Sequence, residues 1–316
     1  MKFSPIVVVL AGVVGFGLGT WLTAPHPRVA LAQSAAETAV SLAPNDGKLH
    51  VIVIGAHPDD AQYRGAGVAM KWARRGDHVK LVSATNGDIG HWAMAGGPLA
   101  ERRKKEVTAV DERLGTATEV LDIHDGEIMP TMENRRTFAR LVRAWNADVV
   151  ITNRPNDYHP DHRYTSILVQ DSAYMVGVPF FTDVPPLKKN PIYLYAWDRF
   201  QRPYPFHADI AVGIDDVAEP TVDAFLLMVS QLQEGGADGN ASLYPPNDPA
   251  ARHRRDEQVR QQLLRRYAAQ ADNYRDTLIK FYGAEKGKAI KYAQVFEICE
   301  YGRQPSMAEI KQIFPF

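Results

Sequence analysis

Short apolar runs alternate with amphipathic segments in the first half of the chain. Four segments have the length and β-branched content of buried strands: 51–54, 79–84, 119–123 and 148–152. Apolar residues at helical spacing predict helices between them, over 65–75, 99–114 and 134–145. Alternating strands and helices predict a Rossmann-like three-layer α/β sandwich with a mostly parallel sheet.

The chain changes character after Ser172. Proline-rich loops separate two strand-like runs, 192–197 and 209–214, and helices are predicted over 217–232 and 252–282. We expect this part to form a helical C-terminal extension that packs on the sheet. The predicted organisation is a single domain over 49–316, with a catalytic core of about 49–232 and an extension of about 233–316.

The first 32 residues have the pattern of a targeting segment. Lys2 precedes an apolar stretch from Ile6 to Leu22, and Ala30-Leu31-Ala32 fits a small-x-small cleavage site. We expect residues 1–32 to be a signal peptide, residues 33–48 to be a linker, and the mature protein to be periplasmic or extracellular. The apolar stretch is also long enough to serve as an uncleaved membrane anchor.

Composition narrows the function classes. The chain is 45% hydrophobic and 23% charged with a net charge of -1, which is typical of a globular protein and gives no basic field for nucleic acid. The single cysteine, Cys299, excludes an intrachain disulfide and a cysteine-rich metal site. A membrane is an expected partner only if the N-terminal segment stays uncleaved. The sequence gives no signal for an oligomeric state.

Two predicted strands end in similar polar motifs. The first is followed by His57-Pro-Asp-Asp60 and the fourth by His159-Pro-Asp-His162. Carboxyl ends of parallel strands lie at one edge of a sheet, so the motifs are expected to converge. His57, Asp60 and His162 would form a His₂-Asp metal site with an open coordination position. Asp59 would face the water, although an Asp that caps the next helix explains the first motif alone equally well.

These motifs resemble the PIG-L/LmbE-like family of zinc-dependent de-N-acetylases. The resemblance covers roughly residues 51–170 and continues less specifically to 296–302. It implies one Zn²⁺ per chain and removal of an acetyl group from an N-acetylglucosamine-type sugar or related N-acyl amine. It implies a role for each motif residue as well: His57, Asp60 and His162 as ligands, Asp59 as general base, and His159 as oxyanion stabiliser held by Asp161.

The chemistry of amide hydrolysis agrees with this assignment. Zinc activates water and polarises a carbonyl, and a nearby carboxylate transfers the proton. A protonated imidazole opposite the metal is expected to stabilise the oxyanion. One position departs from the family pattern, since the first motif usually ends in Glu and this chain has Gln62. Glutamine keeps the shape and the hydrogen bonding of glutamate but lacks its charge near the metal, which can alter metal affinity or the basicity of the bound water.

Weaker signals extend the candidate site. Asp88, His91 and Trp92 follow the second strand and could line a sugar pocket, although an Asn-Gly turn explains the segment too. Arg103 matches a family helix motif and could reach the site, whereas a surface ion pair with Glu106 is the simpler alternative. His124, Asp125 and Glu127 could form the rim of a pocket, although a polar turn explains them equally well. Four residues that flank the second motif could contact substrate, although roles in stabilising the loop explain them at least as well: Asn156, Asp157, Tyr158 and Arg163.

Rival classes remain open at this point. A metal-dependent phosphoesterase uses similar ligands but usually two metals and more carboxylates. A non-catalytic sugar-binding protein on a degenerate hydrolase scaffold is another alternative, for which Gln62 is the hint. The sequence lacks G-x-G-x-x-G after the first strand and lacks G-x-S-x-G, which disfavours a dinucleotide-binding domain and a serine hydrolase.

Overall fold

A computed structural model describes residues 42–316. The expected signal peptide and most of the expected linker therefore lie outside the described residues. The described residues belong to one compact unit, Val40–Phe316. Within residues 42–316, every helix is too short or too polar to cross a bilayer.

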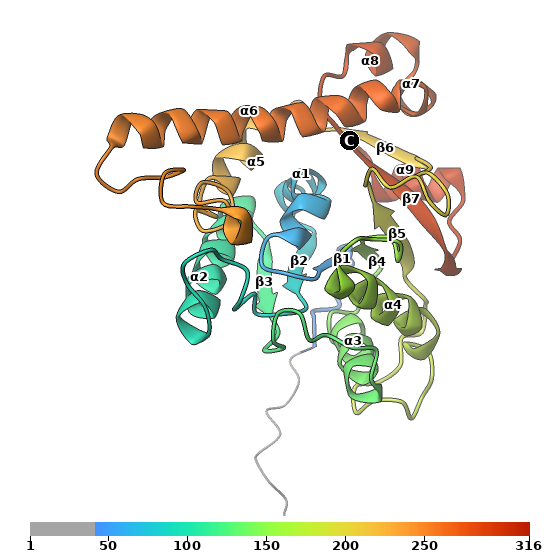
Figure 1. Ribbon diagram of the computed structural model, residues 1–316. Coiled ribbons are helices and arrows are strands. Elements are labelled where there is room, and N and C mark those ends of the chain that lie inside the picture. The colour runs from blue at the N-terminus through green and yellow to red at the C-terminus, as the bar shows by residue number, and fades with distance from the viewer. Residues whose placement is uncertain (1–41) are drawn as a thin grey trace, which may run out of the picture. The chain divides into compact units, whose positions relative to one another are not determined.

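One seven-stranded sheet forms the centre of the molecule (Figure 1). Its strands are β1 (His50–Gly55), β2 (His78–Ser83), β3 (Ala117–Val120), β4 (Val149–Thr152), β5 (Ile192–Ala196), β6 (Ile210–Gly213) and β7 (Ala293–Gly302). The spatial order is β3-β2-β1-β4-β5-β7-β6, and only β7 pairs antiparallel to its neighbours. The predicted mostly parallel α/β sheet is confirmed.

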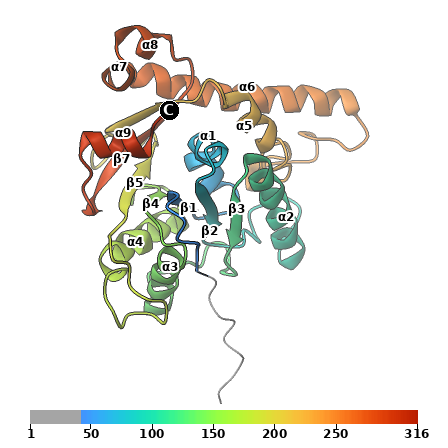
Figure 2. The same ribbon diagram turned by 180° about the vertical axis from the view of Figure 1, so that it is seen from behind.

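Helices cover both faces of the sheet (Figures 1 and 2). They are α1 (Asp60–Arg74), α2 (Gly97–Leu114), α3 (Met132–Ala144), α4 (Pro160–Met175), α5 (Ala218–Phe225), α6 (Pro249–Asn273), α7 (Arg275–Tyr282), α8 (Ala284–Ala289) and α9 (Met307–Ile313), with a 3₁₀ turn at Gly236–Asp238. Alternate side chains of β1 lie in two hydrophobic cores, one on each face of the sheet. Val51 and Val53 pack with α1, α2, α5 and α6, whereas Ile52 and Ile54 pack with α3 and α4. This gives the three layers.

The helix after β1 begins earlier than its apolar spacing predicts. It starts at Asp60 rather than at Gly65, immediately after a tight turn. Gly55 permits this turn, because a Cβ at that position would lie 2.4 Å from the Cβ of Asp60. The close approach places Asp60 directly at the end of the strand.

The C-terminal part holds helices, as expected, and also a strand that the sequence did not predict. The helix predicted over 217–232 ends at Phe225, and the one predicted over 252–282 is divided into α6 and α7 at Tyr274. β7 lies in the segment expected to be a helical extension, yet it occupies the sheet between β5 and β6.

The two motif-bearing strands are neighbours. β1 and β4 pair in parallel, with Val51 opposite Val149 and Val53 opposite Ile151. The chain runs outward from β1 through β2 to β3 and then returns to place β4 on the other side of β1. Open α/β sheets bind ligands at such a switch point, beyond the carboxyl ends of the strands.

Candidate active site

Three donor atoms meet at the carboxyl ends of β1 and β4. Oδ2 of Asp60 lies 3.2 Å from Nδ1 of His57 and 3.2 Å from Nε2 of His162, and the two nitrogens are 3.3 Å apart. Ligands about 2.0–2.1 Å from a tetrahedral zinc ion are about 3.3–3.4 Å from one another. The three atoms therefore fit one triangular face of a zinc coordination sphere. We call His57, Asp60 and His162 the triad.

Three carboxylates contact the two imidazoles at the ring nitrogens that face away from the triangle of donor atoms. Nε2 of His57 lies 3.0 Å from Oδ1 of Asp125 and 3.2 Å from Oδ2 of Asp161. Nδ1 of His162 lies 3.1 Å from Oδ2 of Asp157, a distance typical of an ion pair, although without the alignment of a hydrogen bond. Carboxylates in this position orient histidine ligands and increase their basicity.

Together with Asp60, these carboxylates stabilise positive charge on the two histidines of the triad. Burial disfavours a charged His57, but hydrogen bonds to Asp125, Asp161 and Asp60 outweigh it and hold the pKa of His57 well above its usual range. Burial acts in the same sense on His162, and the carboxylates of Asp60 and Asp157 nevertheless raise its pKa to about 9. A bound cation would supply the positive charge that these surroundings favour.

The structure decides between the two explanations offered for Asp59. The residue occupies the N-cap position of α1, but its side chain accepts no capping hydrogen bond. Its carboxylate lines the hollow beside the triad and lies 3.7 Å from Nη2 of Arg103. Burial, reinforced by the negative charge of Asp60, raises the pKa of Asp59. Helix capping therefore does not account for this residue.

His159 caps a helix, and it contacts the backbone of Asp161 rather than the carboxylate that was predicted to hold it. Nδ1 of His159 accepts a hydrogen bond from the backbone N–H of Asp161, 3.2 Å away, at the start of α4. An accepting Nδ1 leaves Nε2 as the N–H of a neutral imidazole. The carboxylate of Asp161 instead contacts His57 and the backbone N–H of Gly126, 2.7 Å away. Asp161 thus supports His57 through its side chain, because α4 turns that side chain under the triad.

A hollow of about 500 Å³ opens beside the triad. One wall is formed by residues 235–238 and Gln231, which follow α5 and which the sequence did not single out. Arg103 also lines it, although its guanidinium is buried and donates to the carbonyls of Gly87 and Pro58 at 3.0 and 3.3 Å. Arg103 thus fastens the loops after β1 and β2 beneath the pocket.

Three candidates from the loop after β2 do not reach this pocket. The carboxylate of Asp88 is buried and contacts the backbone N–H of Asp125 and the ring of His124. Nε2 of His91 lies 2.9 Å from Glu234, so this residue holds the loop that follows α5. Trp92 lines a separate hollow with Tyr244 and Arg252. The predicted sugar-contacting roles of Asp88, His91 and Trp92 are not supported by these positions.

Gln62 does not contact the triad either. Its side chain is buried, and its Nε2–H donates to Oδ1 of Asp111 on α2 at 2.8 Å. Gln62 does not line the hollow beside the triad. The expectation that this residue acts on the metal is corrected, because position 62 faces α2. Gln62 therefore no longer favours a degenerate scaffold.

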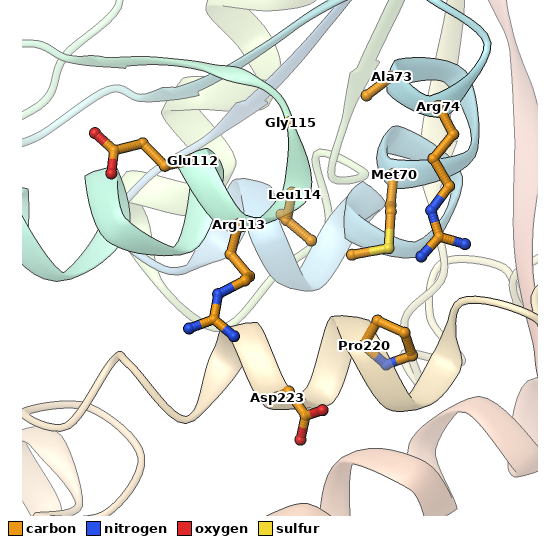
Figure 3. Close-up of a pocket in the computed structure, with 9 residues that line it drawn as sticks. All are labelled: Met70, Ala73, Arg74, Glu112, Arg113, Leu114, Gly115, Pro220 and Asp223. Atoms are coloured by element: carbon orange, nitrogen blue, oxygen red, sulfur yellow. The ribbon is translucent and has the colours of Figure 1, made fainter.

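Two other polar features lie elsewhere in the described residues. A hollow of about 440 Å³ opens between α1, α2 and α5 (Figure 3), where Met70 and Leu114 approach each other and Arg113 extends toward α5. It contains none of the motif residues. A second His-Asp group, formed by Asp46, His50 and His78, lies at the amino ends of β1 and β2, the opposite edge from the triad.

Fold and site define an α/β protein with a His-Asp cluster that could hold a metal ion at the carboxyl edge of its sheet. Residues 52–173 match the family described as PIG-L, GlcNAc-PI de-N-acetylase, and form a domain of this family. The predicted resemblance to the PIG-L/LmbE-like family is thereby confirmed.

A curated relative agrees with this assignment. The probable N-acetyl-α-D-glucosaminyl L-malate deacetylase 2 of Bacillus anthracis is 32% identical over 135 residues. The match spans 39% of this chain and 58% of that relative.

Solved structures share the fold at low identity. The N,N'-diacetylchitobiose deacetylase of Pyrococcus horikoshii is 21% identical with a TM-score of 0.60, over 79% of this chain and 83% of its own. The 4-carboxy-2-hydroxymuconate hydratase GalB of Pseudomonas putida KT2440 is 17% identical with a TM-score of 0.63, over 81% of this chain and 97% of its own. These two proteins catalyse different reactions, so the fold does not identify the reaction.

Proposed function

We propose that this protein is an exported, zinc-dependent hydrolase that removes the acetyl group from an N-acetylglucosamine-type sugar or related N-acyl amine. The observation that carries the proposal is the triangle of donor atoms from His57, Asp60 and His162, with sides of 3.2–3.3 Å. These three residues would hold one Zn²⁺ per chain. The family domain and the relative named as a sugar deacetylase support the substrate class.

Zinc, when bound, supplies a Lewis acid that polarises the acetamide carbonyl and makes water more acidic. Asp59 accepts the proton of the attacking water and returns it to the leaving amine. In this proposal the hollow of about 500 Å³ beside the triad receives the acetamido group, and we name it the acetamide pocket. The free carboxylate of Asp59 in its wall suits the role of proton acceptor, and Arg103 at 3.7 Å positions it. His159 presents its Nε2–H to the developing oxyanion, in the tautomer that its capping bond selects.

The proposed location follows from the first 32 residues. Lys2, the apolar stretch and the small-x-small site support export, with the mature chain in the periplasm or outside the cell. An uncleaved N-terminal segment would instead anchor the protein to a membrane. Fractionation of cells, with mass analysis of the mature N-terminus, tests this part of the proposal.

The decisive experiment combines metal analysis with a screen for freed amine. We expect the purified protein to hold one zinc ion and to release amine from N-acetylated sugars. Asp59→Asn should keep the zinc and lose at least about 100-fold in turnover, because it removes the proton acceptor. His78→Gln, at the opposite edge of the sheet, serves as the control for metal bound outside the site.

Other outcomes would identify other functions. A protein without stoichiometric zinc whose amide hydrolysis is unchanged by Asp59→Asn would contradict the proposal. Release of phosphate from sugar phosphates, lost on chelation, would indicate a phosphoesterase. Binding of N-acetyl sugars without turnover, with zinc present, would indicate a non-catalytic binding protein.

A further inference from the structure

A second, smaller hollow lies on the other side of the triad. It has a volume of about 230 Å³ and shares Asp60, Tyr63, Tyr158 and His162 with the acetamide pocket, so the two spaces are adjacent. Its remaining wall carries three arginines, Arg64, Arg199 and Arg266, and we name it the arginine pocket. A ligand in the acetamide pocket could extend into it.

The carboxylates that line the arginine pocket already have partners. Asp198 forms a two-pronged pair with Arg154, at 2.5 and 2.8 Å. Asp60 belongs to the triad, and Asp157 lies behind His162 at 3.1 Å. None of these carboxylates is within hydrogen-bond distance of the three arginines. The carboxylates of this wall are therefore paired with other groups and do not hydrogen-bond to the three arginines.

Of the three guanidinium groups, only that of Arg64 has carboxylates nearby among the described residues, and it forms no hydrogen bond with them. Nη2 of Arg64 lies 3.8 Å from Asp60 and 3.9 Å from Asp157, beyond hydrogen-bond distance. Within residues 42–316, Arg199 and Arg266 form no ion pair, and no side-chain hydrogen bond is donated by any of the three. Nε of Arg64 and Nε of Arg266 are buried without an acceptor. Buried donors without acceptors are costly. Nε of Arg103 and of Arg143 also lacks an acceptor, but their Nη atoms donate to carbonyls, so the Nη atoms without acceptors are what points to a ligand in this pocket.

Other buried arginines of this chain show the contrast. The guanidinium of Arg143 donates to three backbone carbonyls and to Thr182. Arg154 donates to Asp198 and to two carbonyls. The fold therefore gives the Nη atoms of these two structural arginines their acceptors, although Nε of Arg143 lacks one, and leaves the Nη atoms of the arginines beside the triad without any in the described part of the chain.

Aromatic rings hold two of the free guanidinium groups in place. Cζ of Arg266 lies 5.2 Å from the ring of Trp197 and 5.4 Å from that of Tyr63, and Cζ of Arg199 lies 5.5 Å from Trp197. Contact with a ring uses the face of a guanidinium and leaves its N–H edge available. That edge matches a carboxylate or a phosphate, which it can bind through two parallel hydrogen bonds.

We propose that the arginine pocket binds an oxyanion, carboxylate or phosphate, carried by the substituent of the N-acetylated sugar substrate. The inference rests on the proposed deacetylase function, since it places the acetamido group in the neighbouring pocket. It assigns Arg266 and Arg199 as specificity residues. Arg64 contributes to the field of the pocket but lies near Asp60, so it is the less informative position for a test.

The test compares three ligands that differ only at C1: N-acetylglucosamine 1-phosphate, the carboxymethyl glycoside and the neutral methyl glycoside. Binding to the zinc-loaded, full-length Asp59→Asn protein is measured by calorimetry, so that turnover does not interfere. We expect at least one anionic ligand to bind about tenfold tighter than the methyl glycoside or better. The tighter of the two anions identifies the source of the charge.

Arginine variants locate the anion. Arg266→Gln and Arg199→Gln should each weaken the anionic ligand about tenfold and leave the neutral one unchanged. Arg265→Gln, an exposed neighbour on α6, is the matched control and should change neither. Because Arg199 is exposed, its variant remains informative if Arg266→Gln fails to fold.

Several outcomes would overturn the inference. Equal affinity for the neutral and anionic ligands would do so, and so would an anion affinity that neither arginine variant alters, since the anion would then bind the metal alone. If wild-type protein frees amine from none of the three sugars, the deacetylase proposal fails, while the binding comparison still decides the role of the arginine pocket.

Discussion

The Nε2–H of Gln62 donates a hydrogen bond to Oδ1 of Asp111 across the interface of α1 and α2, at 2.8 Å. Both side chains are buried, and Oδ2 of Asp111 accepts a second bond from Thr118 at 2.7 Å. An amide at position 62 can donate to this carboxylate, whereas a carboxylate there would oppose it. The departure from the family motif is therefore matched by a partner on the neighbouring helix.

Replacing the amide should destabilise the fold. Gln62→Glu places two carboxylates in one buried site and should lower the free energy of unfolding by about 1–3 kcal/mol. The double variant Gln62→Glu with Asp111→Asn restores a donor and acceptor pair and should recover most of the loss. Urea unfolding measures both, and zinc content should stay unchanged. A single variant as stable as wild type would show that this contact does not matter.

Asp111 should also make stability depend on pH. Burial raises the pKa of Asp111 to about 7 against hydrogen bonds from Gln62 and Thr118 that act to lower it. Its unfolded pKa is near 3.8, so the native state holds the proton more tightly and stability falls as pH rises from about 4 to about 7. The slope is at most about 1.4 kcal/mol per pH unit.

This contribution is isolated by difference. Unfolding free energies of wild type and Asp111→Asn are measured at several values between pH 4.5 and 7.5. The gap between them should widen in favour of the variant as pH rises, because asparagine cannot ionise. Parallel curves would contradict the assignment.

The carboxylates behind His57 should control metal affinity. Asp161→Asn and Asp125→Asn each weaken the acceptor at Nε2 of His57, so zinc affinity should fall about 10- to 100-fold. Competition with a chromogenic chelator measures this without an activity assay. Asp171→Asn, which alters a pair with Arg135 on the helix surface, is the control. Unchanged affinity in both variants would remove these residues from the metal site.

The ion pair beneath the arginine pocket should matter for stability. The side chain of Arg154 is fully buried, and Asp198 accepts from both Nε and Nη2. Asp198→Ala leaves this charge without its carboxylate and should cost about 3–5 kcal/mol in thermal or urea unfolding. Asp216→Ala removes a surface pair with Lys71 and should cost less than about 1 kcal/mol. Similar losses for both would argue against a special role of burial.

The sequence predicted what strand ends and local spacing control. The carboxyl ends of parallel strands lie at one edge of a sheet. The convergence of His57, Asp60 and His162 therefore followed from two motifs placed after two strands of one sheet. The pattern also located most elements to within a few residues. The start of α1 was missed, because its first turn is polar and its early onset depends on the close approach allowed by Gly55.

Contacts between distant segments could not be predicted in this way. Asp161 contacts His57 rather than His159, and Asp88 accepts a hydrogen bond from the backbone N–H of Asp125 after β3. Both contacts depend on how the loops pack, which local sequence patterns do not show. The wall formed by residues 235–238 comes from an irregular segment after α5, which has no periodic pattern. The metal-ligand candidates thus followed from the sequence, whereas the pocket wall formed by Gln231 and residues 235–238 did not.

The position of β7 has a consequence for the order in which the chain is assembled. Among the described strands β6 pairs only with β7, although four helices separate them in the chain. A growing polypeptide therefore emerges with the edge of β5 bare and β6 without a neighbour until residues 293–302 have been made. An uncovered strand edge invites pairing with other chains. Completion of the sheet, and protection from aggregation, thus wait until β7 has been synthesised.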